Sequence, residues 1–312
     1  MFVVVGEALV DLVGEQGSRT FVAHPGGSPA NVALGLARLG DPVTLVTRLG
    51  ADPFGEMVST HLQASGVRVD GDPRPGARTS LAVATLASGS ATYDFRIEWD
   101  IGDLEPLPDE SRCLHTGSLA TALAPGSGKV VELLEHERRR GRVTISYDPN
   151  VRPALLGEPE DARPGIEHVV GLSDVVKVSD EDLAWLYPGR TDEDVARDWL
   201  NAGPGLVVVT RGAAGVLAVT AEVEVEQPAR PIELVDTVGA GDSFTAGLLD
   251  GLAGADLLGG GRRAALAAVD EVTLTSVLDE AGQVADITCA RPGTDPPTRA
   301  ELDVDVRGRG AR

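Results

Sequence analysis

The chain has 312 residues, 42% of them hydrophobic, which is enough for one large α/β domain or two ordinary ones with a substantial core. A formal net charge of −21, with only two lysines, argues against nucleic acid or an anionic membrane as a partner. No segment reaches the roughly 18 uninterrupted apolar residues of a membrane span, and the N-terminus lacks the basic start of a signal peptide, so we expect a cytoplasmic protein.

The first part of the chain predicts short strands and two helices from apolar periodicity and from glycines at helix ends. Two alternating runs around Ser88-Gly89-Ser90 predict a hairpin. In chain order, the predicted elements are a strand at 3–5, a helix at 30–39, a strand at 43–47, a helix at 54–64 and paired strands at 79–86 and 91–97.

From Cys113 onward, strands and helices alternate as in right-handed βαβ units, which predicts a doubly wound, mostly parallel sheet. The hairpin at 79–97 lies outside this alternation and predicts a small lid sheet. A glycine- and arginine-rich end predicts a disordered tail at 307–312. The later elements are strands at 113–116, 143–146, 175–178 and 206–210, helices at 128–140 and from Ser179, a hairpin at 216–220 and 223–225, and a helix at 241–252.

The most informative segment holds Gly239, Ala240, Gly241 and Asp242 at the start of the last of these helices. Backbone N–H groups at a helix N-terminus bind anions such as phosphate, helped by the helix dipole. A carboxylate beside them can take a proton from an attacking hydroxyl. The segment therefore predicts either phosphoryl transfer to an alcohol or, on its own, only a tight glycine turn before a helix.

Several other kinds of site fail on their residues. A dinucleotide-binding fingerprint needs glycine where Phe244 stands, and the phosphate loop of nucleotide hydrolases needs Ser or Thr where Val130 follows Lys129. The five histidines and two distant cysteines lack zinc-ligand spacing, and no Gly-x-Ser-x-Gly motif supports a serine hydrolase. We expect Cys113 and Cys289 to be buried free thiols, as in a reducing compartment.

Two segments near the N-terminus combine turns with polar groups. Asp11 follows the first strand, where ligands of parallel sheets bind, so it either accepts hydrogen bonds from substrate hydroxyls or is a solvated loop acid. The segment Pro25–Asn31 either lets a small ligand approach Gly26 and Gly27, with Asn31 as donor and acceptor, or simply starts a helix.

Three further strand ends carry polar groups. Arg152, after Asp148, suits bidentate recognition of phosphate or carboxylate. Ser179 and Asp182 form either a helix cap or, through Asp182, an acid that orders water around Mg²⁺. The segment Thr210–Gly215 either borders a nucleotide or turns a hairpin.

Together these segments resemble the PfkB/ribokinase family of sugar kinases. Asp236–Phe244 resembles its C-terminal DTxGAGD signature, Gly26–Ala33 its N-terminal GGxxxN signature, and Arg48–Gly55 the G-x-D-x-x-G segment that follows. The resemblance runs in order through nearly the whole chain. It implies one ribokinase-like α/β kinase domain over 1–306, with a lid formed by about 12–25 and 79–103.

Within the family, Gly6–Asp11, the GGSPAN form and the segments after Asp148 and Thr288 look most like fructokinases. The resemblance implies MgATP-dependent phosphorylation of a primary sugar hydroxyl, most simply fructose to fructose 6-phosphate. Asp242 is the implied base, and the N–H groups around Gly239, Ala240 and Gly241 the anion hole. The implied sugar-binding residues are Asp11, Gly26, Gly27, Asn31, Arg96 on the lid, and Arg152.

For the nucleotide, the resemblance implies a site bordered by Lys177, Ser179, Thr210, Gly212, Gly215 and Gly282. The family often carries NxxE at its Mg²⁺ motif, where this chain has Ser179 and Asp182, and Asp286 stands where a small apolar residue is expected near adenine. Loops near Asp236 and Cys289–Gly293 resemble those that hold a monovalent cation, which implies K⁺. Relatives often dimerise through the lid, which implies a homodimer.

Two alternatives stay open at this point. A 2-keto-3-deoxygluconate kinase shares much of the pattern and needs a cation for the substrate carboxylate, which Arg96 or Arg152 supplies. A non-catalytic sugar or nucleotide sensor on the same fold has no need of a base at Asp242.

Overall fold

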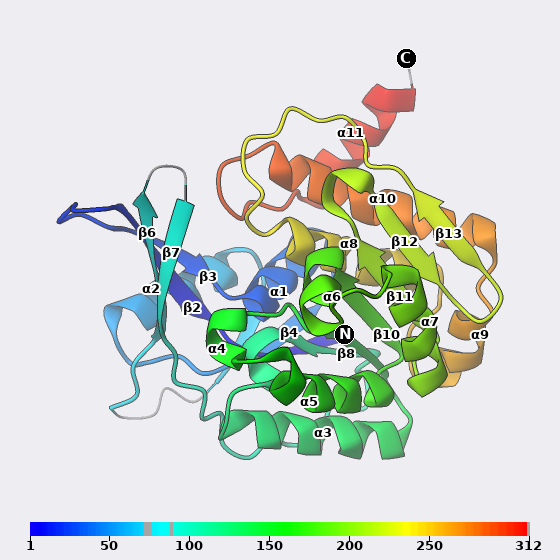
Figure 1. Ribbon diagram of the computed structural model, residues 1–312, viewed down its shortest axis with the longest axis horizontal. Coiled ribbons are helices and arrows are strands. Elements are labelled where there is room, and N and C mark those ends of the chain that lie inside the picture. Colours follow the sequence, from blue (N-terminus) through cyan, green and yellow to red (C-terminus); the bar gives the residue numbers. More distant parts are fainter. Residues whose placement is uncertain (72–75, 88–89, 311–312) are drawn as a thin grey trace.

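The structure is a computed structural model that describes residues 1–71, 76–87 and 90–310. Its centre is a nine-stranded sheet in the order β13-β12-β11-β10-β9-β8-β1-β4-β5, and a four-stranded sheet in the order β3-β2-β6-β7 lies beside it (Figure 1). The strands from β11 to β5 pair in parallel, whereas β12 and β13 pair antiparallel at one edge. The doubly wound, mostly parallel sheet is thus confirmed.

The strands of the large sheet are short and buried. They are β1 (Phe2–Val5), β4 (Val43–Val46), β5 (Arg68–Asp70), β8 (Cys113–Gly117), β9 (Thr144–Asp148), β10 (Val175–Ser179), β11 (Leu206–Thr210), β12 (Val216–Val219) and β13 (Glu224–Gln227).

Helices cover both faces of this sheet, because alternate side chains of each strand point to opposite faces. Val4 joins the core beneath α1, α8 and α10, whereas Val3 and Val5 join the core beneath α3, α5 and α7. These helices are α1 (Ser28–Arg38), α8 (Ala240–Gly254), α10 (Glu271–Cys289), α3 (Gly126–Arg140), α5 (Pro159–Leu172) and α7 (Asp192–Ala202). The others are α2 (Pro53–Ala64), α4 (Pro153–Leu156), α6 (Asp180–Leu186), α9 (Arg263–Ala267) and α11 (Arg299–Gly310), with 3₁₀ turns at Ser118–Thr121, Gly212–Ala214 and Gly260–Arg262.

The small sheet contains the predicted hairpin, β6 (Ser80–Ala87) and β7 (Ser90–Arg96), and adds β2 (Leu9–Glu15) and β3 (Val22–Gly26). Ser88 and Gly89 of the predicted turn lie outside the described residues. Because β2 pairs in parallel with β6, the two segments predicted to form the lid lie in one sheet.

Asp52 joins the small sheet to the main body. Its carboxylate caps α2 through the Gly55 N–H at 2.9 Å and accepts hydrogen bonds of 2.8 Å from both the N–H and the hydroxyl of Thr79. The G-x-D-x-x-G segment therefore fixes the point at which the chain enters β6.

The C-terminal region differs from the prediction. The long helix α10 had no predicted counterpart, although Asp270 caps it through the Thr273 N–H. Helix α11 continues to Gly310, into the segment where a disordered tail is predicted, and residues 311–312 lie outside the described part. Two glycines near the end weaken helix propensity, but the helix is anchored upstream by buried Leu302. None of the described helices has the length and hydropathy of a membrane span.

Candidate active site

The site is built around Asp242, in the first turn of α8. Its carboxylate is buried and accepts a hydrogen bond of 2.6 Å from the Ser28 hydroxyl on Oδ1 and one of 2.8 Å from the Asn31 carboxamide on Oδ2. Ser28 and Asn31 both lie in the first turn of α1. The structure therefore brings the two glycine-rich segments together, with the N-termini of α1 and α8 at one place.

Burial raises the pKa of Asp242 above its usual value, because a charged carboxylate loses its hydration inside the protein. The hydrogen bonds from Ser28 and Asn31 favour the ionised form and oppose this rise, whereas the negative charge of Asp148 adds to it. A carboxylate in this setting is a stronger base than one in water, which suits proton transfer from a hydroxyl.

Gly239 lies at the left-handed φ of 76° just before α8, which favours glycine. The loop before it is held by Asp236, whose carboxylate accepts hydrogen bonds from the Val238 N–H at 3.0 Å and the Gly293 N–H at 2.8 Å. The loops around Asp236 and Cys289–Gly293, which resemble those of a monovalent cation site, thus lie together. Both carboxylate oxygens of Asp236 already accept a hydrogen bond from a backbone N–H group.

A buried ion pair lies under the first turn of α8. The Lys177 ammonium is 3.0 Å from Oδ2 of Asp148, and both side chains are buried. Asp148 also accepts a hydrogen bond from the Asn150 N–H at 3.1 Å. A Cβ placed on Gly241 would lie 2.9 Å from the Lys177 Nζ, so the ammonium is in contact with the α8 turn.

At the neighbouring strand ends, Ser179 is the N-cap of α6 and accepts a hydrogen bond from the Asp182 N–H at 3.0 Å. The carboxylate of Asp182 accepts one from the Val151 N–H at 3.1 Å. The capping interpretation of this pair is correct. Thr210 is paired with Ser179 across β10 and β11, so both lie at the carboxyl ends of these strands, close to Lys177.

The two glycines after β11 differ. Gly215 lies at φ 102°, and a Cβ there would be 1.9 Å from the Gln227 carbonyl oxygen, so packing against β13 requires this glycine. Gly212 faces open space. Gly282 lies on α10 under the Arg230 guanidinium, which also pairs with Asp286 at 3.2 Å and explains an acid at that position.

On the substrate side, Asp11 lies on β2 against Gly26, where a Cβ would be 2.1 Å from its Oδ2. Burial raises the pKa of Asp11 to about 6, with the charges of His24 and Arg152 opposing the rise and Asp242 adding to it. Gly27, at φ 104°, begins α1 and has no room for a side chain beside the Glu7 carbonyl. The negative charges of Asp11 and Asp242 are thus close enough to repel each other, which places both carboxylates in the same part of the site.

Arg152 brings a second positive charge to this region, besides that of Lys177. Its guanidinium donates a hydrogen bond of 2.7 Å to the Asn150 carboxamide and one of 3.0 Å to the Val151 carbonyl. Burial raises the pKa values of Glu7, Asp11 and Asp182, and the charge of Arg152 opposes the rise in all three. Arg152 therefore lies close to the predicted sugar-binding and metal-binding acids together.

Arg96 does not join this group. In the small sheet it shares a row with Leu81 and Val10, whereas Asp11 shares the next row with Ala82 and Phe95. Adjacent rows face opposite sides of a sheet, and Val10 is in the main core. The Arg96 side chain is 71% exposed and lies 3.6 Å from Asp94.

Two residues of the site were not predicted from the sequence. Ser28 holds Asp242, and its position inside the GGSPAN segment was the available signal. Glu7 is buried, its Oε2 has no hydrogen-bond partner among the described residues, and burial raises its pKa to about 7. The signal for Glu7 was a charged residue directly after a buried strand.

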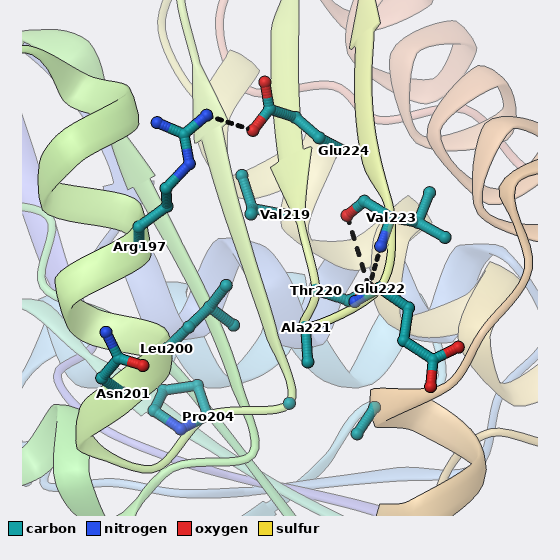
Figure 2. Close-up of a pocket in the computed structure, with 12 residues that line it drawn as sticks. Arg197, Leu200, Asn201, Pro204, Val219, Thr220, Ala221, Glu222, Val223 and Glu224 are labelled. Atoms are coloured by element: carbon teal, nitrogen blue, oxygen red, sulfur yellow. Dashed lines mark hydrogen bonds and ion pairs between the residues drawn. The ribbon is translucent and has the colours of Figure 1, made fainter.

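A cavity of about 500 Å³ lies elsewhere, at the far end of β11 and β12, between α7 and the β12–β13 hairpin (Figure 2). An ion pair of 2.6 Å between Arg197 and Glu224 crosses its rim. None of the predicted site residues lines it.

Comparison with known proteins agrees with the geometry. The model of the family described as pfkB family carbohydrate kinase matches residues 1–296. A fructokinase of Rhizobium leguminosarum bv. trifolii is 36% identical over 286 residues, covering 88% of this chain and 85% of the relative. The structure of Xylella fastidiosa fructokinase with bound ATP superposes with a TM-score of 0.88 at 27% identity, covering 99% of this chain and 98% of the other.

A fructokinase double mutant of Vibrio cholerae O395, solved with fructose, ADP and potassium ion, superposes with a TM-score of 0.80 at 28% identity, and 97% of each chain is covered. The match to the family model spans nearly the whole chain and includes both glycine-rich segments that meet at Asp242. The chain therefore belongs to the pfkB family of carbohydrate kinases.

Proposed function

We propose that this protein is an ATP-dependent fructokinase, which transfers the γ-phosphoryl group of ATP to the primary 6-hydroxyl of fructose. The observation that carries the proposal is the buried carboxylate of Asp242, oriented by Ser28 and Asn31 at the N-terminus of α8. The Rhizobium and Xylella relatives named fructokinase support fructose as the sugar.

In this mechanism Asp242 accepts the proton of the attacking hydroxyl. The hydroxyl oxygen then bonds to the γ-phosphorus, and the bond to the β-phosphate oxygen breaks, releasing ADP. The N–H groups of Gly239 and Gly241 face the transferring phosphoryl group, where the helix dipole favours negative charge. The Ala240 N–H donates a hydrogen bond of 3.2 Å to the Thr237 carbonyl and helps to shape this turn. Asp242 needs no rearrangement for this step, because two hydrogen bonds already fix its carboxylate.

The sugar lies between β2 and the start of α1. Asp11 and Asn31 bond its hydroxyls, and Gly26 and Gly27 let it approach the backbone. Arg152, at the start of α4 after β9, faces the substrate. The raised pKa of Asp11 supports this placement, because a carboxyl held in a poorly hydrated region gains from hydrogen bonds to hydroxyls.

ATP lies across the carboxyl ends of β10 and β11. Its border consists of Lys177, Ser179, Thr210, Gly212, Gly215 and, next to adenine, Gly282. Bound Mg²⁺ neutralises phosphate charge. Mg²⁺ would be held chiefly by the phosphates, with Asp182 acting through water. K⁺ would be held by the loops of Asp236 and Gly293, which the Asp236 carboxylate links.

The protein acts as a cytoplasmic homodimer formed through the small sheet. Val22, Val13, Ala84 and Tyr93 share one row of that sheet. Val22 is 56% and Tyr93 53% exposed, which leaves an apolar surface that a second copy would cover. The buried free thiols Cys113 and Cys289 suit a reducing compartment.

The deciding experiment measures ADP release by the purified protein with MgATP and a panel of sugars. Highest kcat/KM with fructose supports the proposal. Highest kcat/KM with 2-keto-3-deoxygluconate would identify the alternative kinase. Ligand binding without turnover of any sugar would contradict an enzyme and favour a sensor.

A further inference from the structure

Lys177 is a buried cation beside the start of helix α8. Its ammonium touches the first turn of α8, as the distance of 2.9 Å from a Cβ on Gly241 shows. Cations are stabilised at helix C-termini, whereas the N-terminus carries partial positive charge. The side chain is also only 7% exposed, so water does not screen this repulsion. A buried cation at this position needs anions beside it, and Asp148 is one of them.

Gly241 provides the space for this arrangement. It is the second residue of α8 and lies in ordinary helical conformation, so the backbone does not demand glycine there. Among the described residues, and apart from the neighbouring residues and the backbone of α8 itself, Lys177 Nζ is the heavy atom that lies within 4 Å of the added Cβ. Because Gly241 has no side chain, the ammonium of Lys177 has room to lie next to the N–H groups at the start of α8.

Asp148 holds the ammonium in place and keeps it charged. Burial alone would lower the pKa of Lys177, but the charge and hydrogen bond of Asp148 reverse this, and the pKa is raised. The contact of 3.0 Å uses one of three ammonium N–H donors. The other donors can serve an anion that lies at the start of α8.

We propose that Lys177 is a catalytic residue of phosphoryl transfer, whose ammonium binds an oxygen of the γ-phosphoryl group at the N-terminus of α8. This inference rests on the proposed kinase function. Lys177 keeps its proton throughout: the hydroxyl proton passes to Asp242, the new oxygen–phosphorus bond forms, and the bond to ADP breaks. The ammonium stabilises the charge on the phosphoryl oxygens.

The test compares Lys177→Met with Lys129→Met, because these are the chain's two lysines. Lys129 is on the surface of α3, paired with Asp103. We expect Lys177→Met to lower kcat about 10²- to 10³-fold, the usual loss for one donor to a developing oxyanion, with the KM for sugar changed less than about threefold. Lys129→Met should match the wild type. A kcat of Lys177→Met near that of the wild type would overturn the proposal.

Loss of Lys177 leaves Asp148 buried without its cation, so a second variant separates folding from chemistry. Lys177→Met combined with Asp148→Asn removes both charges. If Lys177 acts only as a structural partner, the double variant regains activity, and the proposal fails. If it acts on the phosphoryl group, activity stays low while the thermal midpoint recovers.

A binding measurement gives an independent readout. ADP with aluminium fluoride and sugar imitates the transferring phosphoryl group. Lys177→Met should weaken binding of this mixture at least tenfold while ADP alone binds as to the wild type; equal binding of both would contradict the role. Failure of the proposed function looks different, since wild-type protein would then turn over no sugar.

Discussion

The Asn31 carboxamide donates a hydrogen bond of 2.8 Å to the Asp242 carboxylate, although 211 residues separate them in the chain. The bond joins the first turn of α1 to the first turn of α8, two helices that pack side by side on one face of the large sheet (Figure 1). A residue predicted to bind sugar thus also orients the predicted base. In the proposed mechanism, this contact couples sugar binding to proton transfer.

Asp242→Asn should lower kcat by about 10²-fold or more, because the amide cannot accept the hydroxyl proton. Its size is unchanged, its oxygen can still accept the hydrogen bond from Ser28, and Asn31 can turn its carboxamide to accept one from the new NH2 group. Sugar affinity should therefore stay near that of the wild type. Steady-state kinetics and calorimetric sugar binding check both points. Near-normal turnover would contradict the role of Asp242 as base.

Ser28→Ala should shift the pH profile of kcat/KM. The Ser28 hydrogen bond lowers the pKa of Asp242, so its loss raises that pKa further above the usual value. The base works when ionised, and the acidic limb of the profile should therefore move to higher pH. A uniform loss of rate at every pH, without displacement of the limb, would contradict this account.

The sequence predicted the elements at the site well, because glycines, strand ends and helix starts are local signals. Asp242 at the start of α8 and Asn31 in the first turn of α1 are examples. The hydrogen bond between them is a tertiary contact and leaves no local trace. The face of Arg96 was also beyond prediction, since it depends on how β2 and β6 pair, and a shift of one residue reverses it.

Arg96→Ala and Arg152→Ala form a matched pair for the sugar site. Arg96 lies on the face of the small sheet opposite Asp11, so its removal should change kcat and KM less than about twofold. Arg152 lies among Glu7, Asp11 and Asp182, and its removal should lower kcat/KM at least tenfold. A large effect of Arg96→Ala would show that the small sheet moves over the sugar during turnover.

Glu7 should make stability fall as pH rises. Its ordinary pKa is 4.5, and burial raises the pKa in the folded protein to about 7. Between these values the folded state binds more protons than the unfolded state, so the free energy of unfolding decreases with pH. The shift corresponds to roughly 3 kcal/mol, present below pH 4.5 and lost as pH passes 7.

The amide introduced by Glu7→Gln cannot ionise. The free energy of unfolding of this variant should therefore lack the decrease with pH that Glu7 causes in the wild type. Urea unfolding from pH 4.5 to 8 should show equal stability of variant and wild type at the acidic end. At pH 8 the variant should be more stable by a few kcal/mol. Asp11, with its own raised pKa, is present in both proteins, so its contribution cancels in the difference.

Glu105→Gln, at an exposed position, is the control and should follow the wild type. Parallel curves for Glu7→Gln and wild type would show that Glu7 ionises at its ordinary pKa, despite its burial and its unpartnered Oε2.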